Sequence, residues 1–167
     1  MDKFQKYKDY KTIISVNVLI WCKGKVLLLK RSEKKSIDPG VYSGIGGKVE
    51  PGESVYEAIV REAEEEAGIK DLGSLRVFSI TQHPYPPTEC EWVNIYFNAT
   101  MKEMPDIPKS DEGEFHWVEP KDVDSLNMVH DLQEYIKILS KDPNAFILGF
   151  FNYDKSGKLA EKTIEVL

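Results

Sequence analysis

Several features that mark whole classes of proteins are scarce or absent in this sequence. Its 167 residues contain two cysteines, Cys22 and Cys90, which are too few for a disulfide framework and lack metal-ligand spacing. The three histidines, His83, His116 and His130, are scattered, so we expect no zinc site. No apolar run reaches the roughly 18 residues of a membrane-spanning helix, and the Lys- and Tyr-rich N-terminus lacks the apolar stretch of a signal peptide. We therefore expect a cytoplasmic protein without a membrane partner.

Positive charge is not in excess either. The 22 Lys and Arg residues against 28 Asp and Glu give a net charge of −6, which argues against a general nucleic-acid binder because such proteins need a basic face. A polyphosphate substrate is compatible with this charge if metal ions supply positive charge locally. The apolar content of 41% and charged content of 30% are ordinary for a globular protein. The length fits one domain spanning residues 1–167, with no internal repeat or linker.

The order of apolar and turn-forming residues predicts a mixed α+β fold. Helices are expected after the N-cap Ser54, up to Gly68, and from His130 to Ser140. Strands are expected at residues 12–21, 26–30, 75–82, 91–101 and 114–118, with a short helix at 120–124 and a closing hairpin of 146–153 and 159–166. Residues 44–47 are predicted to form a glycine-rich loop. Residues 83–87 are predicted to form a stiff loop, because proline cannot join a sheet centrally.

The stretch from residue 47 to residue 69 combines this glycine-rich approach with an acidic helix. Ser54 and Glu57 form a capping box at its start. Glu62, Glu65 and Glu66 stand at i, i+3 and i+4, so their carboxylates share one patch of helix surface and repel one another. A divalent cation reverses the sign of that interaction, and Mg²⁺ prefers hard oxygen ligands together with substrate phosphates. The spacing therefore favours a metal-binding helix over a merely solvated one.

The same stretch fits the pattern G-x5-E-x7-R-E-U-x-E-E-x-G-U, where U is an aliphatic residue. Its seven fixed positions are filled by Gly47, Glu53, Arg61, Glu62, Glu65, Glu66 and Gly68. At ordinary residue frequencies this coincidence arises about once in 10⁸ starting points. The chain thus resembles the Nudix hydrolases of the MutT type, and residues 47–69 resemble the Nudix box. The resemblance implies an α/β/α sandwich with a mixed central sheet and the Mg²⁺-dependent hydrolysis of a phosphoanhydride, with Mn²⁺ as an alternative cofactor.

The resemblance also implies roles for the residues of the box. Glu65, Glu66 and the backbone carbonyl of Gly46 would be metal ligands, and Glu62 would be either a further ligand or the general base. Arg61 would orient these glutamates, with Glu53 as its partner.

Many Nudix members draw one more carboxylate from a loop well after the box. The candidates here are Asp111, Glu112 and Glu114, which precede a Phe-His-Trp-Val segment. Glu112, followed by Gly113 a few residues before Trp117, resembles the MutT arrangement most closely and is our predicted additional ligand.

Two further segments point to a substrate. Residues 40–49 and 128–131 resemble those of Nudix enzymes that hydrolyse oxidised purine nucleoside triphosphates (8-oxo-dGTP diphosphatases) to the monophosphate and pyrophosphate. In that group an acidic residue near the position of Asp131 reads the purine edge, so Ser43, Lys48 and Asp131 are predicted to bind substrate. The sequence departs from the group by having Tyr42 in place of Trp and Ser43 in place of Asn.

Two other functions fit the sequence. One is a pyrophosphatase for ADP-ribose or another nucleoside diphosphate derivative, in which Tyr85, Trp92 or Tyr96 would stack on the base. The other is a Nudix-fold binding module without activity, although such modules typically lack carboxylates that this box retains. In each case the partner is a small nucleotide, and the protein is expected to be a monomer or a homodimer.

Overall fold

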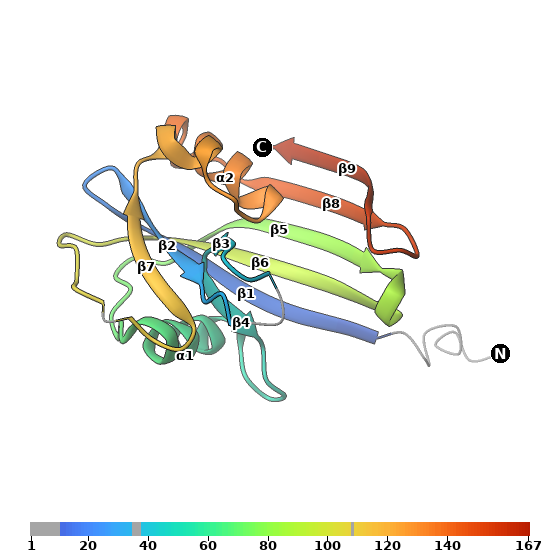
Figure 1. The fold of residues 1–167 in the computed structure, drawn as a ribbon, viewed down its shortest axis with the longest axis horizontal. Coiled ribbons are helices and arrows are strands. Elements are labelled where there is room, and N and C mark those ends of the chain that lie inside the picture. Colours follow the sequence, from blue (N-terminus) through green and yellow to red (C-terminus); the bar gives the residue numbers. More distant parts are fainter. Residues whose placement is uncertain (1–10, 35–37, 108) are drawn as a thin grey trace.

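The computed structural model describes residues 11–34, 38–107 and 109–167, without the side chains of Thr88 and His130 (Figure 1). The elements are β1 (Lys11–Cys22), β2 (Lys25–Arg31), β3 (Tyr42–Ser43), β4 (Ile45–Lys48), α1 (Val55–Ala67), β5 (Arg76–Tyr85), η2 (Pro86–Thr88), β6 (Cys90–Thr100), β7 (Gly113–Val118), η3 (Pro120–Ser125), α2 (His130–Lys141), β8 (Ile147–Tyr153) and β9 (Leu159–Val166). Of the helices among these elements, none combines the length and apolar character needed to cross a membrane.

Within the described residues, the strands form one mixed sheet. Its main order is β3-β2-β1-β6-β5-β8-β9, while β4 pairs with β1 and β7 pairs with β2. β1 runs parallel to β6 and β5 runs parallel to β8, whereas the other pairs are antiparallel. β2 and β4 both pair with β1, β2 at its end and β4 along its middle. This arrangement confirms the predicted mixed sheet.

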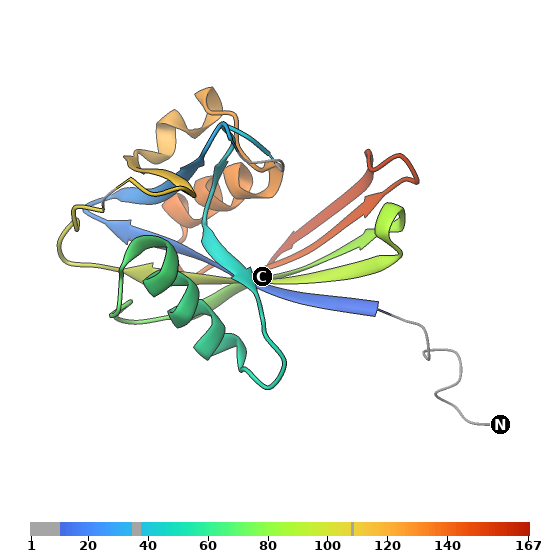
Figure 2. The ribbon, with the colours of Figure 1, turned by 60° about the horizontal axis from the view of Figure 1, so that its bottom comes forward.

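The two long helices cover opposite faces of the sheet (Figure 2). β1 alternates between them, as a strand buried on both faces must. Val16 and Val18 pack in the apolar cluster that contains Ile59 of α1, whereas Leu19 packs in the cluster that contains Tyr135 and Ile136 of α2 (the latter two not exposed at all). The α/β/α sandwich implied by the resemblance is therefore confirmed.

Local chemistry fixes the ends of α1 as predicted. The Ser54 hydroxyl accepts a hydrogen bond from the Glu57 N–H, and the Glu57 carboxylate accepts one from the Ser54 N–H, which completes the capping box. The helix ends at Gly68, which adopts a left-handed conformation with φ of 67°.

Two loop predictions were wrong. Residues 45–48 of the glycine-rich segment form β4, because pairing with β1 satisfies their backbone groups in spite of the glycines. Residues 83–85 continue β5, and Pro84 lies opposite Glu91 of β6. Proline is tolerated there because β8 pairs with β5 only as far as Gln82, so that β5 has a free edge beyond this point.

Candidate active site

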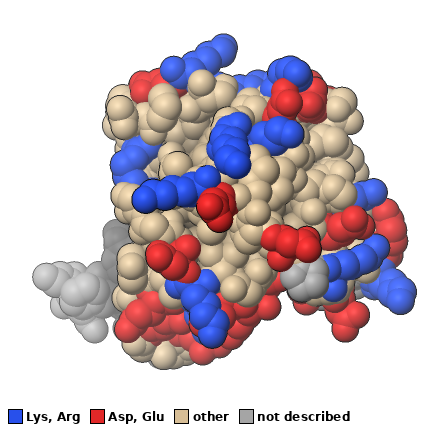
Figure 3. All heavy atoms as spheres, turned by 90° about the vertical axis from the view of Figure 1, so that its left-hand side faces the viewer, with Lys and Arg blue, Asp and Glu red and all other residues tan. Residues whose placement is uncertain are grey.

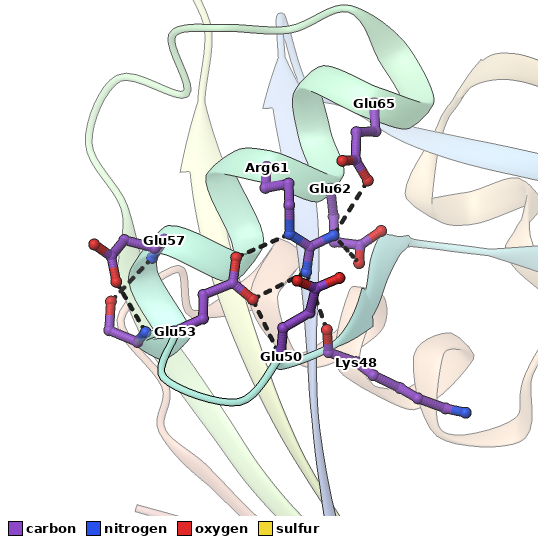
Figure 4. A network of polar contacts seen from close by, with 8 residues as sticks. Lys48, Glu50, Glu53, Glu57, Arg61, Glu62 and Glu65 are labelled. Carbon is purple, nitrogen blue, oxygen red and sulfur yellow. Dashed lines mark hydrogen bonds and ion pairs between the residues drawn. The ribbon is translucent and has the colours of Figure 1, made fainter.

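Arg61 lies at the centre of the polar network on α1 (Figure 4). Its Nε and Nη2 donate to the two carboxylate oxygens of Glu53 at 2.8 and 3.0 Å. Its Nη1 donates to Glu62 at 2.7 Å and to Glu65 at 3.1 Å, and its Nη2 also reaches the backbone carbonyl of Lys48 at 3.1 Å. These bonds keep the Arg61 guanidinium charged, with its pKa above the ordinary value. Arg61 therefore connects Glu53, in the loop before α1, with Lys48 of β4 and with Glu62 and Glu65 of α1.

The paired glycines of β4 let the strand lie directly against the acidic helix. A Cβ atom on Gly47 would come within 2.2 Å of the Glu62 carboxylate. A Cβ atom on Gly46 would meet the Val16 carbonyl oxygen of β1 at 2.0 Å, so this position has no room for a side chain. The Gly46 N–H donates to the Glu66 carboxylate at 3.2 Å. The glycines thus bring the backbone of β4 into contact with Glu62 and Glu66.

Glu66 occupies an unfavourable electrostatic environment. Burial raises the pKa of its carboxyl to about 7, and the charges of Glu62 and Glu112 add to this increase. The Gly46 N–H and the Arg31 charge act in the opposite direction. Acidic side chains also gather over the lower part of one face of the molecule, where α1 lies (Figure 3). A buried carboxyl among like charges is stabilised either by a proton or by a cation.

Glu112 lies close enough to Glu66 for its charge to raise the Glu66 pKa, although the two residues come from different segments. The loop that carries it is held beside β2, because the Ser32 N–H donates to the Glu112 carbonyl at 2.8 Å. Asp111 and Glu114 are not among the main influences on the Glu66 pKa, and Glu114 pairs with Lys109. Of these three carboxylates, Glu112 is thus the one whose charge acts most on the glutamates of the box.

The residues at this site suit a divalent cation of the Mg²⁺ type. Glu62, Glu66 and Glu112 offer hard carboxylate oxygens around the Gly46 backbone, which is the donor chemistry that Mg²⁺ and Mn²⁺ prefer. Among the described residues, no three His, Cys, Asp or Glu side chains already converge as ligands. Glu62 and the exposed Glu65 are instead held by Arg61, so they would have to turn toward an ion.

A cavity of about 790 Å³ lies over strands β5, β6 and β8 of the sheet. Its floor consists of alternate residues on neighbouring strands, because side chains two apart share a face. Asn94 and Trp92 of β6 lie opposite Thr81 and His83 of β5, and Phe151 and Tyr153 of β8 complete the row. Its other walls are formed by Asp38, Val41, Tyr85, Tyr96, Asn127, Met128, Val129, Asp131 and Gly157.

Asp131 is the buried polar group of this cavity, with 3% of its surface exposed. The Tyr96 hydroxyl donates to its Oδ2 at 2.7 Å, and the Leu132 N–H donates to its Oδ1 at 3.0 Å. Both oxygens therefore act as hydrogen-bond acceptors. Asp131 lies in the first turn of α2, at the positive end of the helix dipole.

The other two predicted substrate residues lie differently. The Lys48 ammonium sits 5.5 Å from the ring centre of Trp92, which lines the cavity, although Lys48 itself is not a lining residue. Ser43 lies on β3 and is not among the residues that line the cavity. Its neighbour Tyr42 bridges to Met128, which does line it.

Sequence reasoning missed several residues of the cavity, notably His83, Asn94, Phe151 and Tyr153. Predicting a loop at 83–87 hid the fact that the alternation of Ser79 and Thr81 continues to His83 and Tyr85 on the same face. That alternation was the signal that could have found His83.

Comparison with known proteins agrees with this geometry. A family model described as the NUDIX domain matches residues 11–138. The chain is 31% identical over 139 residues to YvcI of Bacillus subtilis, described as an uncharacterized Nudix hydrolase, covering 82% of this chain and 84% of YvcI. It is 33% identical over 95 residues to the NAD-capped RNA hydrolase NudC of Pseudomonas aeruginosa, but this match spans 57% of the chain and only 32% of NudC.

A solved structure supports the same assignment. The structure described as a mutator MutT protein from Bacillus halodurans superposes with a TM-score of 0.77 at 25% identity, covering 92% of this chain and 97% of that one. The family match covers the acidic helix, the strands that position it and the loop that carries Glu112. The chain therefore belongs to the Nudix hydrolases, which cleave phosphoanhydride bonds in nucleotide derivatives.

Proposed function

We propose that the protein hydrolyses a purine nucleoside triphosphate, with an oxidised guanine nucleotide of the 8-oxo-dGTP kind as the preferred substrate, to the monophosphate and pyrophosphate. The observation that carries this proposal is the buried carboxylate of Asp131, whose two oxygens both accept hydrogen bonds inside an aromatic cavity. An acceptor pair of this kind matches the guanine edge, where N1–H and the 2-amino group are adjacent donors. Adenine offers one donor next to a ring nitrogen that would face the carboxylate.

The phosphate chain would run from the cavity toward α1. Lys48 supports this path, because its ammonium lies against Trp92 at the cavity while its backbone carbonyl is bound by Arg61. Glu62, Glu65, Glu66, Glu112 and the Gly46 carbonyl would hold the Mg²⁺ or Mn²⁺ ions. When bound, these ions neutralise phosphate oxygens and lower the pKa of water. The active protein would thus bind a small nucleotide and its metal ions together.

In the reaction, water attacks one phosphorus atom of the α–β phosphoanhydride and the bridging oxygen leaves with the other, so that the products are the monophosphate and pyrophosphate. Glu62 serves either as a further ligand or as the base that takes the proton from water, a role that its position between Arg61 and Gly47 allows. Arg61 acts through the glutamates, because it binds Glu53, Glu62 and Glu65 at once.

A nucleotide panel tests the proposal. GTP, dGTP, 8-oxo-dGTP, ATP, dATP and ADP-ribose are incubated with Mg²⁺, and the monophosphate, phosphate and pyrophosphate products are quantified. We expect guanine triphosphates to have the highest kcat/KM and to yield pyrophosphate. Asp131→Asn should reduce the guanine preference more than kcat, whereas the exposed Asp124→Asn should leave both unchanged. Faster turnover of ADP-ribose than of any triphosphate would reject the proposal.

A second candidate is hydrolysis of a larger nucleoside diphosphate derivative, such as ADP-ribose or a dinucleotide. The size of the cavity, about 790 Å³, and the number of aromatic residues along it favour this candidate. So does the likeness to NudC, which is described as an NAD-capped RNA hydrolase. The ADP-ribose sample of the panel separates the two functions, and NADH can be added as a dinucleotide.

A further inference from the structure

His83 stands in the middle of the cavity floor and is held rigidly there. It lies opposite Trp92 in the β5–β6 ladder. On its other side the imidazole stacks on Phe151 with a centroid distance of 4.8 Å and an interplanar angle of 6°. Tyr153 follows at 6.2 Å and 21°. Phe151 is only 1% exposed, so the face that it covers is closed to a ligand. Contact between His83 and a bound nucleotide is therefore made by the ring edge or by the face turned away from Phe151.

One of the two ring nitrogens is already occupied. His83 Nε2 lies 2.9 Å from the Thr81 hydroxyl, which is fully buried. A buried hydroxyl that does not donate its hydrogen costs free energy, and His83 Nε2 is an acceptor at hydrogen-bond distance from Thr81, whereas the neighbouring Tyr135 hydroxyl can itself donate to the Thr81 oxygen. We therefore orient it with Thr81 donating to Nε2. The neutral ring then carries its hydrogen on Nδ1.

The ring is neutral near pH 7 because burial lowers the pKa of His83 below its ordinary value. The negative charge of Asp131, on α2, acts in the opposite direction but is the smaller influence. The other ionisable side chains lining the cavity are Asp38 on the loop before β3, Tyr85 on β5, Tyr96 on β6 and Tyr153 on β8. The Nδ1–H, which has no hydrogen-bond partner among the described residues, is thus a donor available at this cavity.

We infer that His83 is a specificity-determining residue whose Nδ1–H donates to the 6-oxygen of a guanine-type base, while Asp131 accepts from N1–H and the 2-amino group. This inference rests on the proposed binding of a purine in the cavity. The donor of His83 and the acceptor of Asp131 match adjacent positions of the same base edge. Adenine has an amino group in place of the 6-oxygen, so it would set a donor against the His83 donor. His83 and Asp131 together therefore favour guanine, whose edge pairs with both of them. They disfavour adenine, because its 6-amino group would leave the buried His83 donor unpaired.

Equilibrium binding of product nucleotides tests the inference without any dependence on catalysis. GMP, 6-thio-GMP and AMP are titrated calorimetrically into the wild-type protein and into His83→Phe, His83→Asn and Thr81→Val. The thio analogue keeps N1–H and the 2-amino group but replaces the 6-oxygen by a weak acceptor. Phenylalanine keeps a planar ring to stack on Phe151 and removes both nitrogens, whereas asparagine retains a side-chain N–H donor.

The wild type should bind GMP about 10-fold more tightly than 6-thio-GMP, which is the effect of one hydrogen bond. His83→Phe should lose this difference, and His83→Asn should restore part of it. Thr81→Val should weaken GMP binding to a smaller extent, because the imidazole is then free to place its hydrogen on either nitrogen. Thermal unfolding of each variant checks that the fold is retained.

Two results would overturn the inference. One is an unchanged ratio of GMP to 6-thio-GMP affinity in His83→Phe. The other is an equal loss for all three nucleotides, which would mean a general packing defect. Guanine binding that does not depend on His83 would refute this assignment alone, whereas a wild-type preference for AMP would refute the guanine proposal as well.

Discussion

Replacing Glu66 by glutamine should make the metal-free protein more stable while it removes activity. The raised pKa of Glu66, about 7 against an ordinary 4.5, means that the unfolded chain loses this proton at lower pH than the folded chain does. The stability that Glu66 contributes is therefore fully present below pH 4.5 and is lost as the pH rises through about 7. A shift of this size corresponds to about 3 kcal/mol above neutral pH.

Glutamine avoids this penalty and still offers an oxygen to the Gly46 N–H, although without the strength of a charged acceptor. We therefore expect Glu66→Gln to raise the free energy of unfolding near pH 8 by about 1–3 kcal/mol, and by much less near pH 5. The same variant should lower kcat by on the order of 10³-fold, because a charge aimed at the metal ion is gone.

Urea denaturation in EDTA at several pH values measures the effect, with Glu64→Gln as the control on the same helix. Glu64 is exposed and pairs with Lys70 at the surface, so its replacement should change stability by less than about 0.5 kcal/mol. Added Mg²⁺ should then stabilise the wild type more than the Glu66 variant, because the ion binds the folded state. A Glu66→Gln protein that is less stable than the wild type near pH 8, or whose gain does not vary with pH, would refute the electrostatic reasoning.

Three other substitutions test the remaining parts of the catalytic site. Glu112→Ala should reduce kcat at least 10-fold more than Asp111→Ala or Glu114→Ala, since Glu112 is the residue of this loop whose charge is among the main influences on Glu66; equal small effects in steady-state assays would mean that this loop is only a solvated surface. Arg61→Lys keeps the charge but loses the fork that binds Glu53, so it should cost about 1–2 kcal/mol in urea denaturation and about 10-fold or more in kcat; wild-type kinetics would contradict the orienting role. Gly47→Ala should lower kcat markedly and change the melting temperature little, because the displaced group is the flexible end of Glu62. A large fall in the melting temperature with little change in kcat would mean that backbone strain dominates.

The sequence predicted best those features that local rules decide. The capping box of Ser54 and Glu57 and the end of α1 at Gly68 follow from residues within one or two turns of each other. The i, i+3, i+4 spacing likewise predicts that Glu62 and Glu66 share a patch, and the structure finds them electrostatically coupled. The spacing of residues along a helix fixes which side chains share a face, whatever the rest of the fold is. These inferences therefore required only the segment itself.

Features that depend on distant partners were harder to predict. Glycine-rich β4 exists because β1 pairs with it, and β5 continues through Pro84 because β8 no longer pairs with it beyond Gln82. Neither condition can be read from the residues concerned. The cavity is a still stronger case, since its floor joins residues of β5, β6 and β8 that are separated by up to some seventy positions. Only the family resemblance pointed to Asp131, and the loop predicted at residues 83–87 hid the alternation that leads to His83.

The β8–β9 hairpin lies outside the part of the chain that the family model matches, which ends at residue 138, yet Phe151 and Tyr153 complete the cavity floor. Part of the cavity floor is thus encoded in a different stretch of the gene from the acidic helix. Among the described strands, β5 is the one that pairs the hairpin with the rest of the sheet, so the hairpin sequence can diversify while α1 and β4 keep their positions. Exchanging residues 147–166 between two such enzymes should therefore change nucleotide affinity through Phe151 and Tyr153, while Asp131, His83 and the acidic helix of the recipient stay in place.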